Sequence, residues 1–210
     1  MKLKRLCLTM LLVLALLLLA GCRSNNAGNG SDDNTGNNTS SDTAGDPSEN
    51  AGTDDQESGG DAIPSGPVAQ GDAYRDFTTT LVDGSDFTLS DYEGKVILLN
   101  FWATWCGPCV GEMPAFTQLV ETYGEDLALL AVNCGEDEET VTAFLEKNGY
   151  TFPVALDPEY EISSLYPTDG IPYTVVIGPD GTVAVTQVGA ADADTMYAHY
   201  CEVIDGLLEE

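Results

Sequence analysis

Residues 95–109 read KVILLNFWATWCGPC, and this stretch decides the fold of the chain. The apolar run over 96–102 is typical of a strand that is buried on both faces of a sheet. Directly after it, Cys106 and Cys109 stand two residues apart, with a glycine and a proline between them. Because 107–123 reads as a helix, the cysteine pair is expected where a buried strand gives way to a helix N-terminus.

Strand and helix patterns alternate around this stretch. On its N-terminal side, 74–94 mixes apolar and polar residues, and the turn at Asp83 and Gly84 predicts a hairpin. The other expected elements are helices over 107–123 with a kink at Pro114, 136–149, 158–165 and 191–208, strands over 127–133 and 152–156, and a hairpin over 173–188. This order predicts an α/β fold with a mixed sheet and helices on both of its faces.

The position of the cysteine pair favours redox chemistry. A thiol at the first helical turn feels the positive end of the helix dipole, which stabilises its thiolate, so Cys106 is the expected nucleophile. Gly107 leaves the approach to the sulfur open, and Pro108 costs no needed hydrogen bond at a helix start. Cys109, one turn further in, is expected to be less exposed and to attack a mixed disulfide formed at Cys106.

Three other interpretations of the pair compete with redox catalysis: a structural staple, a metal site, and two inert buried thiols. A structural zinc needs four ligands, and the remaining candidates, Cys134, Cys201 and His199, form no second closely spaced pair. A bridge across two residues closes almost no loop and would stabilise the fold little. Redox catalysis is therefore the favoured interpretation, and it demands neither a metal nor a cofactor.

The N-terminal part of the chain predicts export and a membrane tether. Residues 1–21 place basic residues before an apolar run too short to span a membrane, which predicts a signal peptide. LAGC at 19–22 resembles the lipobox of bacterial lipoproteins and makes Cys22 the expected lipidation site, with an uncleaved anchor helix as the alternative. Residues 22–66 are rich in Gly, Ser, Asn and Asp and predict a disordered acidic tether. One domain remains, over 67–210.

The composition is strongly acidic, with a formal net charge of −28 at pH 7. Nucleic acid is therefore not an expected partner, because its phosphates are bound by basic surfaces. The acidic excess would favour basic partners, but it is more typical of a feature that promotes solubility.

Several motifs carry a family resemblance. NFWATWCGPC at 100–109, Pro114 five residues beyond the second cysteine, and GIP at 170–172 resemble the thioredoxin fold. Over 74–208 the chain resembles the membrane-tethered, extracytoplasmic TlpA/ResA-type thiol–disulfide oxidoreductases, through LSDYEGKVILLNFWATWC, AVNCGED and TAFLEKNGYTFPVALDPE. The resemblance implies a thioredoxin fold with an N-terminal β-hairpin and a central βα insertion around 127–157.

The resemblance also implies roles for residues outside the cysteine pair. Pro172 matches the cis-proline that faces the cysteines in thioredoxin folds, and the backbone around Ile171 would then pair with an extended substrate. Glu112 matches the active-site glutamate of the branch and shares a helix face with Cys109, so we expect it to accept that cysteine's proton. The alternative is a solvated helix glutamate. Trp105 would form an apolar rim beside the nucleophile and offer a surface to peptide substrates.

The remaining polar and aromatic side chains of interest are expected to be structural. Cys134 follows a buried strand and Cys201 lies on the last helix at core spacing, which leaves three interpretations open: separate core thiols, a disulfide between them, or a redox role. His199, the only histidine, is expected on a helix surface, and Trp102 is expected in the core. Asn100 occupies the strand position where thioredoxin has a buried aspartate.

Together these features predict a lipid-anchored, monomeric, extracytoplasmic oxidoreductase that reduces disulfides in other proteins. Substrate contacts are expected at Trp105, Gly107, Pro108, Ile171 and Pro172. The family implies a membrane thiol carrier as electron donor and apocytochrome c as the leading client, with an extracytoplasmic methionine sulfoxide reductase as another. The alternatives are a disulfide oxidase or isomerase and a non-catalytic binding lipoprotein of the same fold. A thiol peroxidase is disfavoured because the threonine-to-cysteine spacing of peroxidatic sites is not seen around the pair.

Overall fold

The computed structural model describes residues 66–209. The predicted signal peptide, the expected lipidation site Cys22 and nearly all of the predicted tether lie outside that range. The strands are β1 (Thr78–Thr80), β2 (Asp86–Thr88), β3 (Val96–Trp102), β4 (Leu127–Cys134), β5 (Val154–Asp157), β6 (Tyr173–Ile177) and β7 (Val183–Val188). The helices are α2 (Gly107–Tyr123), α3 (Glu138–Asn148), α4 (Glu161–Leu165), α5 (Ala193–Glu209) and the short 3-10 helices η1 (Leu89–Tyr92) and η2 (Gly124–Asp126).

Each helix and strand expected from the sequence is present, with bounds that differ by a few residues at most. Pro114 lies inside α2, and the helix continues beyond it to Tyr123. The two 3-10 helices were not predicted, because a single turn leaves no periodicity to read.

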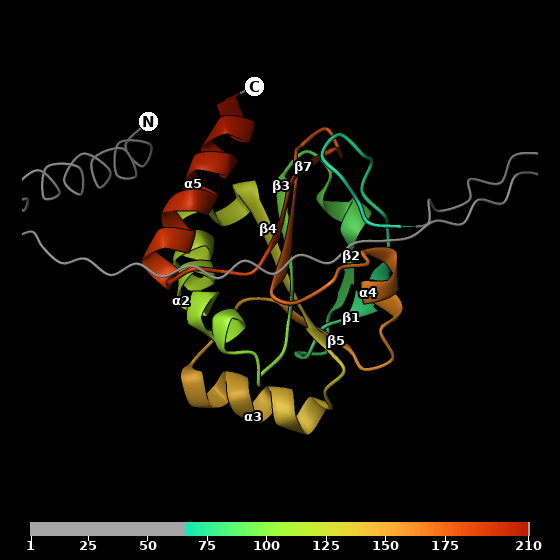
Figure 1. The fold of residues 1–210 in the computed structure, drawn as a ribbon, viewed down its shortest axis with the longest axis vertical. Helices are drawn as coiled ribbons and strands as arrows, with labels where there is room; N and C mark the ends of the chain where they lie inside the picture. The colour runs from blue at the N-terminus through green and yellow to red at the C-terminus, as the bar shows by residue number, and fades with distance from the viewer. Residues whose placement is uncertain (1–65, 210) are drawn as a thin grey trace, which may run out of the picture.

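β3 is the centre of a five-stranded mixed sheet with the strand order β5-β4-β3-β6-β7 (Figure 1). It runs parallel to β4 and antiparallel to β6. All seven residues of β3 are buried, which confirms the burial on both faces predicted from its apolar run. A separate antiparallel pair, β1 and β2, confirms the predicted N-terminal hairpin.

The two faces of the sheet are covered by different elements. Successive residues of β3 point to opposite faces, so Leu98 belongs to the core under α2, α3 and α5, whereas Leu99 belongs to the core under η1 and α4. Figure 1 shows α2 and α5 together on one side of the sheet, with α4 and the β1–β2 pair on the other. Each large side chain buried in these cores contributes about 1.5–3 kcal/mol, so the end of β3 is held firmly in place.

The β1–β2 pair also covers the edge strand β5. Leu81 forms an antiparallel bridge with Ala155, and the N–H of Val82 donates to the carbonyl of Val154 at 2.9 Å. An uncovered edge strand can pair with a strand of another chain, so this contact protects the edge of the sheet from such pairing.

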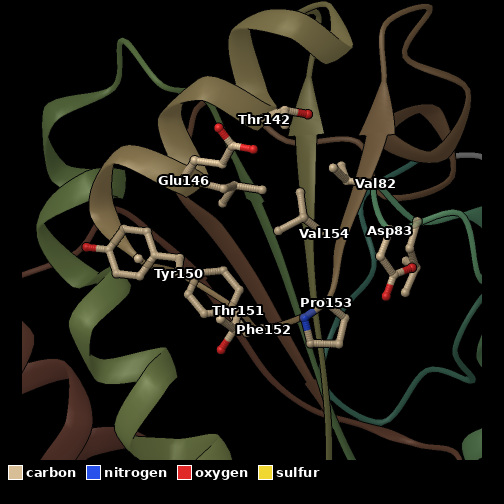
Figure 2. A pocket seen from close by; sticks show the side chains of 12 residues that line it. Val82, Asp83, Thr142, Glu146, Tyr150, Thr151, Phe152, Pro153 and Val154 are labelled. Atoms are coloured by element: carbon tan, nitrogen blue, oxygen red, sulfur yellow. The ribbon is translucent and has the colours of Figure 1, made fainter.

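A pocket of about 410 Å³ lies between the hairpin turn, the C-terminal half of α3 and residues 149–154 (Figure 2). The rings of Tyr150 and Phe152 form one side of it, and Val82 and Val154 lie across from them (Figure 2). No residue that the sequence predicted to carry chemistry lines this pocket. The candidate site therefore lies elsewhere, at the end of β3.

Candidate active site

Cys106 and Cys109 are joined by a disulfide at the N-terminus of α2, with their Cα atoms 5.3 Å apart. Cys106 is the N-cap residue of the helix, and its sulfur accepts a hydrogen bond from the N–H of Cys109 at 3.3 Å. Pro108 is compatible with the first turn, because an N–H at that position would have no partner within the helix. The predicted location of the pair, at a junction between a buried strand and a helix, is confirmed.

Exposure differs sharply among the residues around the disulfide. Cys106 is 6% exposed and Cys109 is 0% exposed, so the second cysteine is the more covered of the two, as expected. Trp105 is 73% exposed beside the pair, whereas Trp102 is fully buried in the core, as predicted. A Cβ atom placed on Gly107 would meet nothing within 4 Å, so the start of the helix is open to an approaching molecule.

The peptide bond between Ile171 and Pro172 is cis, as the family resemblance implied. β6 begins at the next residue, Tyr173, which pairs with Phe101 on β3. Pro172 therefore lies next to the end of β3 that leads into the cysteine pair. Its carbonyl accepts a hydrogen bond from the N–H of Gly189 at 2.7 Å, which ties this loop to the end of β7.

Glu112 is fully buried, so the interpretation as a solvated helix glutamate is wrong. Asn100 Nδ2 donates to its Oε1 and the hydroxyl of Tyr200 donates to its Oε2, each at 3.0 Å. Burial raises the pKa of Glu112 to about 7, and these two hydrogen bonds oppose the rise. A carboxyl that titrates near neutral pH can accept and return a proton under ordinary conditions, which suits a base for a neighbouring thiol.

The sequence did not predict the contacts of Tyr200 and Thr174. Tyr200 comes from α5, 88 residues from Glu112 in sequence, and its hydroxyl lies 3.1 Å from that of Thr174 on β6. Helical spacing could have marked Tyr200 as a core residue. Nothing in that spacing indicates which group its hydroxyl contacts.

Glu136 was also missed, although it holds the loop that leads into the cysteines. Its carboxylate accepts hydrogen bonds from the N–H of Thr104 at 2.7 Å, the hydroxyl of Thr104 at 2.5 Å and Nδ2 of Asn133 at 2.8 Å. Hydrogen bonds to a charged acceptor are among the stronger ones, so the chain is fixed two residues before Cys106. A signal existed: Glu136 follows β4, whose carboxyl end lies beside that of its parallel neighbour β3.

A groove of about 440 Å³ is lined by Trp105, the residue before Cys106, and by Ile171 and Tyr160, among others. Tyr160 was not predicted to belong to the site. It is 55% exposed and has a φ of 60°, a left-handed conformation that is unusual for a large side chain. The hydroxyl end of its ring lies against Gly135, where a Cβ atom would stand 2.1 Å from the Tyr160 hydroxyl oxygen.

The other two cysteines of the described region are separate buried thiols, so the alternative of a disulfide between Cys134 and Cys201 is wrong. Burial raises the pKa of the Cys134 thiol, and its sulfur lies 3.4 Å from the hydroxyl oxygen of Ser163. His199 lies on α5 and is half-buried. Within residues 66–209, no three His, Cys, Asp or Glu side chains gather closely enough to hold a metal ion.

The sheet order and the disulfide at a helix start are those of a thioredoxin-fold thiol–disulfide oxidoreductase. The AhpC/TSA family matches residues 70–186, which is more than half of the sequence, and the chain belongs to that family. No helix between residues 66 and 209 is long and apolar enough to span a bilayer.

Named relatives confirm the resemblance to ResA-type proteins. The chain is 37% identical over 133 residues to thiol-disulfide oxidoreductase ResA of Geobacillus kaustophilus, covering 63% of this chain and 76% of that protein. It is 31% identical over 138 residues to ResA of Bacillus subtilis, covering 65% and 76%. Among solved structures, the thiol:disulfide interchange protein DsbE of Chlorobium tepidum is similar with a TM-score of 0.60 and 31% identity, covering 65% of this chain and 99% of that one. The predicted thioredoxin fold and the activity class are thereby confirmed.

Proposed function

We propose that this protein reduces disulfide bonds in other proteins outside the cytoplasm. The observation that carries the proposal is the Cys106–Cys109 pair at the start of α2, with the buried carboxyl of Glu112 one turn further along the same helix. The relatives named thiol-disulfide oxidoreductase support the reaction class. The lipoprotein-type N-terminus of the sequence supports the location.

The reaction moves two electrons from the protein to its client. In the reduced protein, the Cys106 thiolate attacks a client disulfide, a mixed disulfide forms, and one client thiolate leaves. Cys109 then gives its proton to Glu112 and attacks the Cys106 sulfur, so the second client thiolate leaves. The Cys106–Cys109 disulfide remains on the protein, and each client thiolate takes up a proton, one of them from Glu112.

The environment of Glu112 supports its role as the base. An ordinary glutamate carboxyl, with a pKa of 4.5, is a poor acceptor for the proton of a thiol whose usual pKa is about 8.5. Burial raises the pKa of Glu112 to about 7, which narrows that gap. Proton transfer is most effective when donor and acceptor are matched in this way near the working pH.

The expected substrate contacts surround the disulfide. Gly107 and Pro108 leave the start of the helix open, and an extended client segment would pair with the backbone at Ile171, beside Pro172. Trp105, which is largely exposed, would contact the client residue next to its cysteine. The groove beyond Trp105 has room for that residue.

The client and the electron donor follow from the family resemblance. A membrane thiol carrier would re-reduce the pair, and lipid on Cys22 would keep the monomeric domain within its reach. Apocytochrome c is the leading client, followed by an extracytoplasmic methionine sulfoxide reductase. A disulfide oxidase or isomerase would use the same residues and differ in its reduction potential.

An equilibrium redox titration tests the proposal. The purified protein is equilibrated in dithiothreitol buffers, its thiols are alkylated, and each cysteine is located by peptide mass mapping. A Cys106–Cys109 potential near that of thioredoxin, roughly −270 mV, supports a reductant, whereas a potential near that of DsbA, roughly −120 mV, would turn the function to oxidation. If the two cysteines are never reduced and reoxidised, the protein would be a non-catalytic binding lipoprotein instead of an enzyme.

A further inference from the structure

A closed ring of hydrogen bonds encloses the carboxyl of Glu112. Asn100 Nδ2 donates to Glu112 Oε1 at 3.0 Å and to Thr174 Oγ1 at 2.9 Å. The hydroxyls of Thr174 and Tyr200 lie 3.1 Å apart, and the Tyr200 hydroxyl donates to Glu112 Oε2 at 3.0 Å. The four residues come from β3, α2, β6 and α5, and all of them are buried.

The hydrogen bonds of this ring lead from the Asn100 amide to the Glu112 carboxyl along two arms. Asn100 uses both hydrogens of its amide nitrogen, one for Glu112 and one for Thr174. Because Thr174 accepts there, its single hydrogen is available for Tyr200, and the single hydrogen of Tyr200 goes to Glu112. Both arms of the ring therefore start at the amide and end on the two carboxyl oxygens. This arrangement fits an ionised Glu112, which can only accept.

A proton on Glu112 would weaken this arrangement. The hydrogen bonds from Asn100 and Tyr200 would then end on a neutral acid instead of a charged carboxylate, and hydrogen bonds to a charged acceptor are the stronger ones. The ring thus favours the charged carboxylate, while burial favours the neutral acid. Of the two hydrogen bonds that hold down the pKa of Glu112, the one from Tyr200 has the larger effect.

We propose that Tyr200 is a positioning residue of the thiol–disulfide reaction, and that its hydroxyl, oriented by Thr174, keeps the buried Glu112 ionised and ready to accept the proton of Cys109. This inference rests on the proposed role of Glu112 as the base. From its own helix, Glu112 shares a face with Cys109. From α5 it meets the ionisable Tyr200, and from β3 and β6 it meets the uncharged Asn100 and Thr174.

The ring also connects the base to the predicted substrate loop. Thr174 stands two residues after Pro172 on the strand that begins just beyond the cis bond. It pairs directly with Asn100 in the register of β3 and β6. The same strand that would hold a client segment therefore orients the hydroxyl that sets the charge of Glu112.

Tyr200→Phe tests the inference, because it removes one oxygen and keeps the ring that packs against Phe116. The pKa of Glu112 is measured in the oxidised protein by carbon NMR of labelled glutamate carboxyls, with Glu112→Gln to assign the signal. We expect Tyr200→Phe to raise this pKa by about one pH unit or more, the size of one lost hydrogen bond to a charged group. Tyr197→Phe is the matched control on the same helix, since its hydroxyl contacts Thr122 at 3.0 Å, and it should leave the pKa unchanged.

Thr174 offers a second pair of variants. Thr174→Val removes the hydroxyl that orients Tyr200, and it should raise the pKa of Glu112 in the same direction. Thr174→Ser keeps a hydroxyl at that place, and it should retain the wild-type pKa. If Thr174 had only a structural role, its variants would change the stability of the fold, but Thr174→Val and Thr174→Ser would not differ in the pKa of Glu112.

The reaction itself supplies the second readout. Reduced protein is mixed with the aromatic disulfide dithiobis-nitrobenzoate, so that attack by Cys106 releases one coloured thiolate and attack by Cys109 releases the second. In Tyr200→Phe, the pH midpoint of the second release should rise together with the pKa of Glu112.

The outcomes separate the inference from the proposed function. If the wild-type protein shows no second release at any pH, the proposed function fails, whatever the pKa of Glu112. If the second release occurs but Tyr200→Phe moves neither its pH midpoint nor the pKa of Glu112, the role given to Tyr200 is overturned and the proposed function stands.

Discussion

Gly135 lies against the hydroxyl end of Tyr160, and replacing it with alanine would displace that ring in the groove that Trp105 also lines. The added Cβ atom would stand 2.1 Å from the hydroxyl oxygen of Tyr160 and 2.7 Å from its Cζ atom. These separations are far below van der Waals contact, so the ring must move. Because Tyr160 is half-exposed, it can swing outwards, and we expect Gly135→Ala to fold.

Two costs add in this variant. Gly135 has a φ of +75°, and alanine in this left-handed region costs about 1 kcal/mol more than glycine. Displacing a half-buried aromatic ring loses about 1 kcal/mol of packing, roughly half the value of a fully buried one. The free energy of unfolding should therefore fall by about 2 kcal/mol, which lowers the melting temperature by roughly 6 °C for a domain of this size.

Gly149→Ala is the matched control. Gly149 has a φ of +71°, and a Cβ atom there would meet nothing within 4 Å, so only the backbone cost of about 1 kcal/mol applies. In a Tyr160→Ala background the clash is gone, and Gly135→Ala should cost no more than Gly149→Ala does. A double-mutant cycle compares the wild-type protein, Gly135→Ala, Tyr160→Ala and the double variant. Urea denaturation of these four proteins gives the coupling energy between the two sites, expected at about 1 kcal/mol.

Two results would refute this reasoning about the groove. Gly135→Ala and Gly149→Ala could lose the same free energy of unfolding, which would mean that Tyr160 does not rest on Gly135. Alternatively, the losses in free energy of unfolding caused by Gly135→Ala and Tyr160→Ala could add in the double variant, which would mean that the two residues are not coupled. If the reasoning holds, Gly135→Ala should also slow the reduction of a protein disulfide more than that of a small aromatic disulfide, because only the protein fills the groove.

Three further predictions concern the residues around the disulfide. Burial raises the pKa of Glu112 from an ordinary 4.5 to about 7, so the folded protein loses stability as pH rises through that window and the buried carboxyl ionises. Glutamine stays neutral, so Glu112→Gln should raise the free energy of unfolding by about 3 kcal/mol at pH 8 and leave it unchanged at pH 4, measured by urea denaturation. Glu136→Ala should lower the free energy of unfolding by about 2 kcal/mol and speed hydrogen exchange at the Thr104 amide; unchanged exchange would contradict its role in holding the loop. Cys109→Ser should trap clients as mixed disulfides on Cys106, whereas a variant lacking Cys106 should trap none; equal trapping by both would reverse the assigned roles.

The strand and helix order was predictable because it rests on local patterns. Continuous apolar runs gave β3 and β4, and the Asp137 to Gly149 segment carried acids at its start and a glycine at its end, where α3 has its caps. The cysteine pair could be placed at a helix start for the same reason. The cis bond before Pro172 followed from family resemblance alone, because no periodicity marks a cis proline.

Sequence pattern was thus enough for the fold class, the redox pair and the family of this protein, since each is read from short motifs whose own residues are close together in sequence. Contacts across the fold decided the rest. Glu112 meets Tyr200 across 88 residues and Thr104 meets Glu136 across 32, while Cys134 and Cys201 are buried in different cores and stay apart. A side chain's charge and hydrogen-bond partners depend on what packs around it, and only the folded chain brings those partners together.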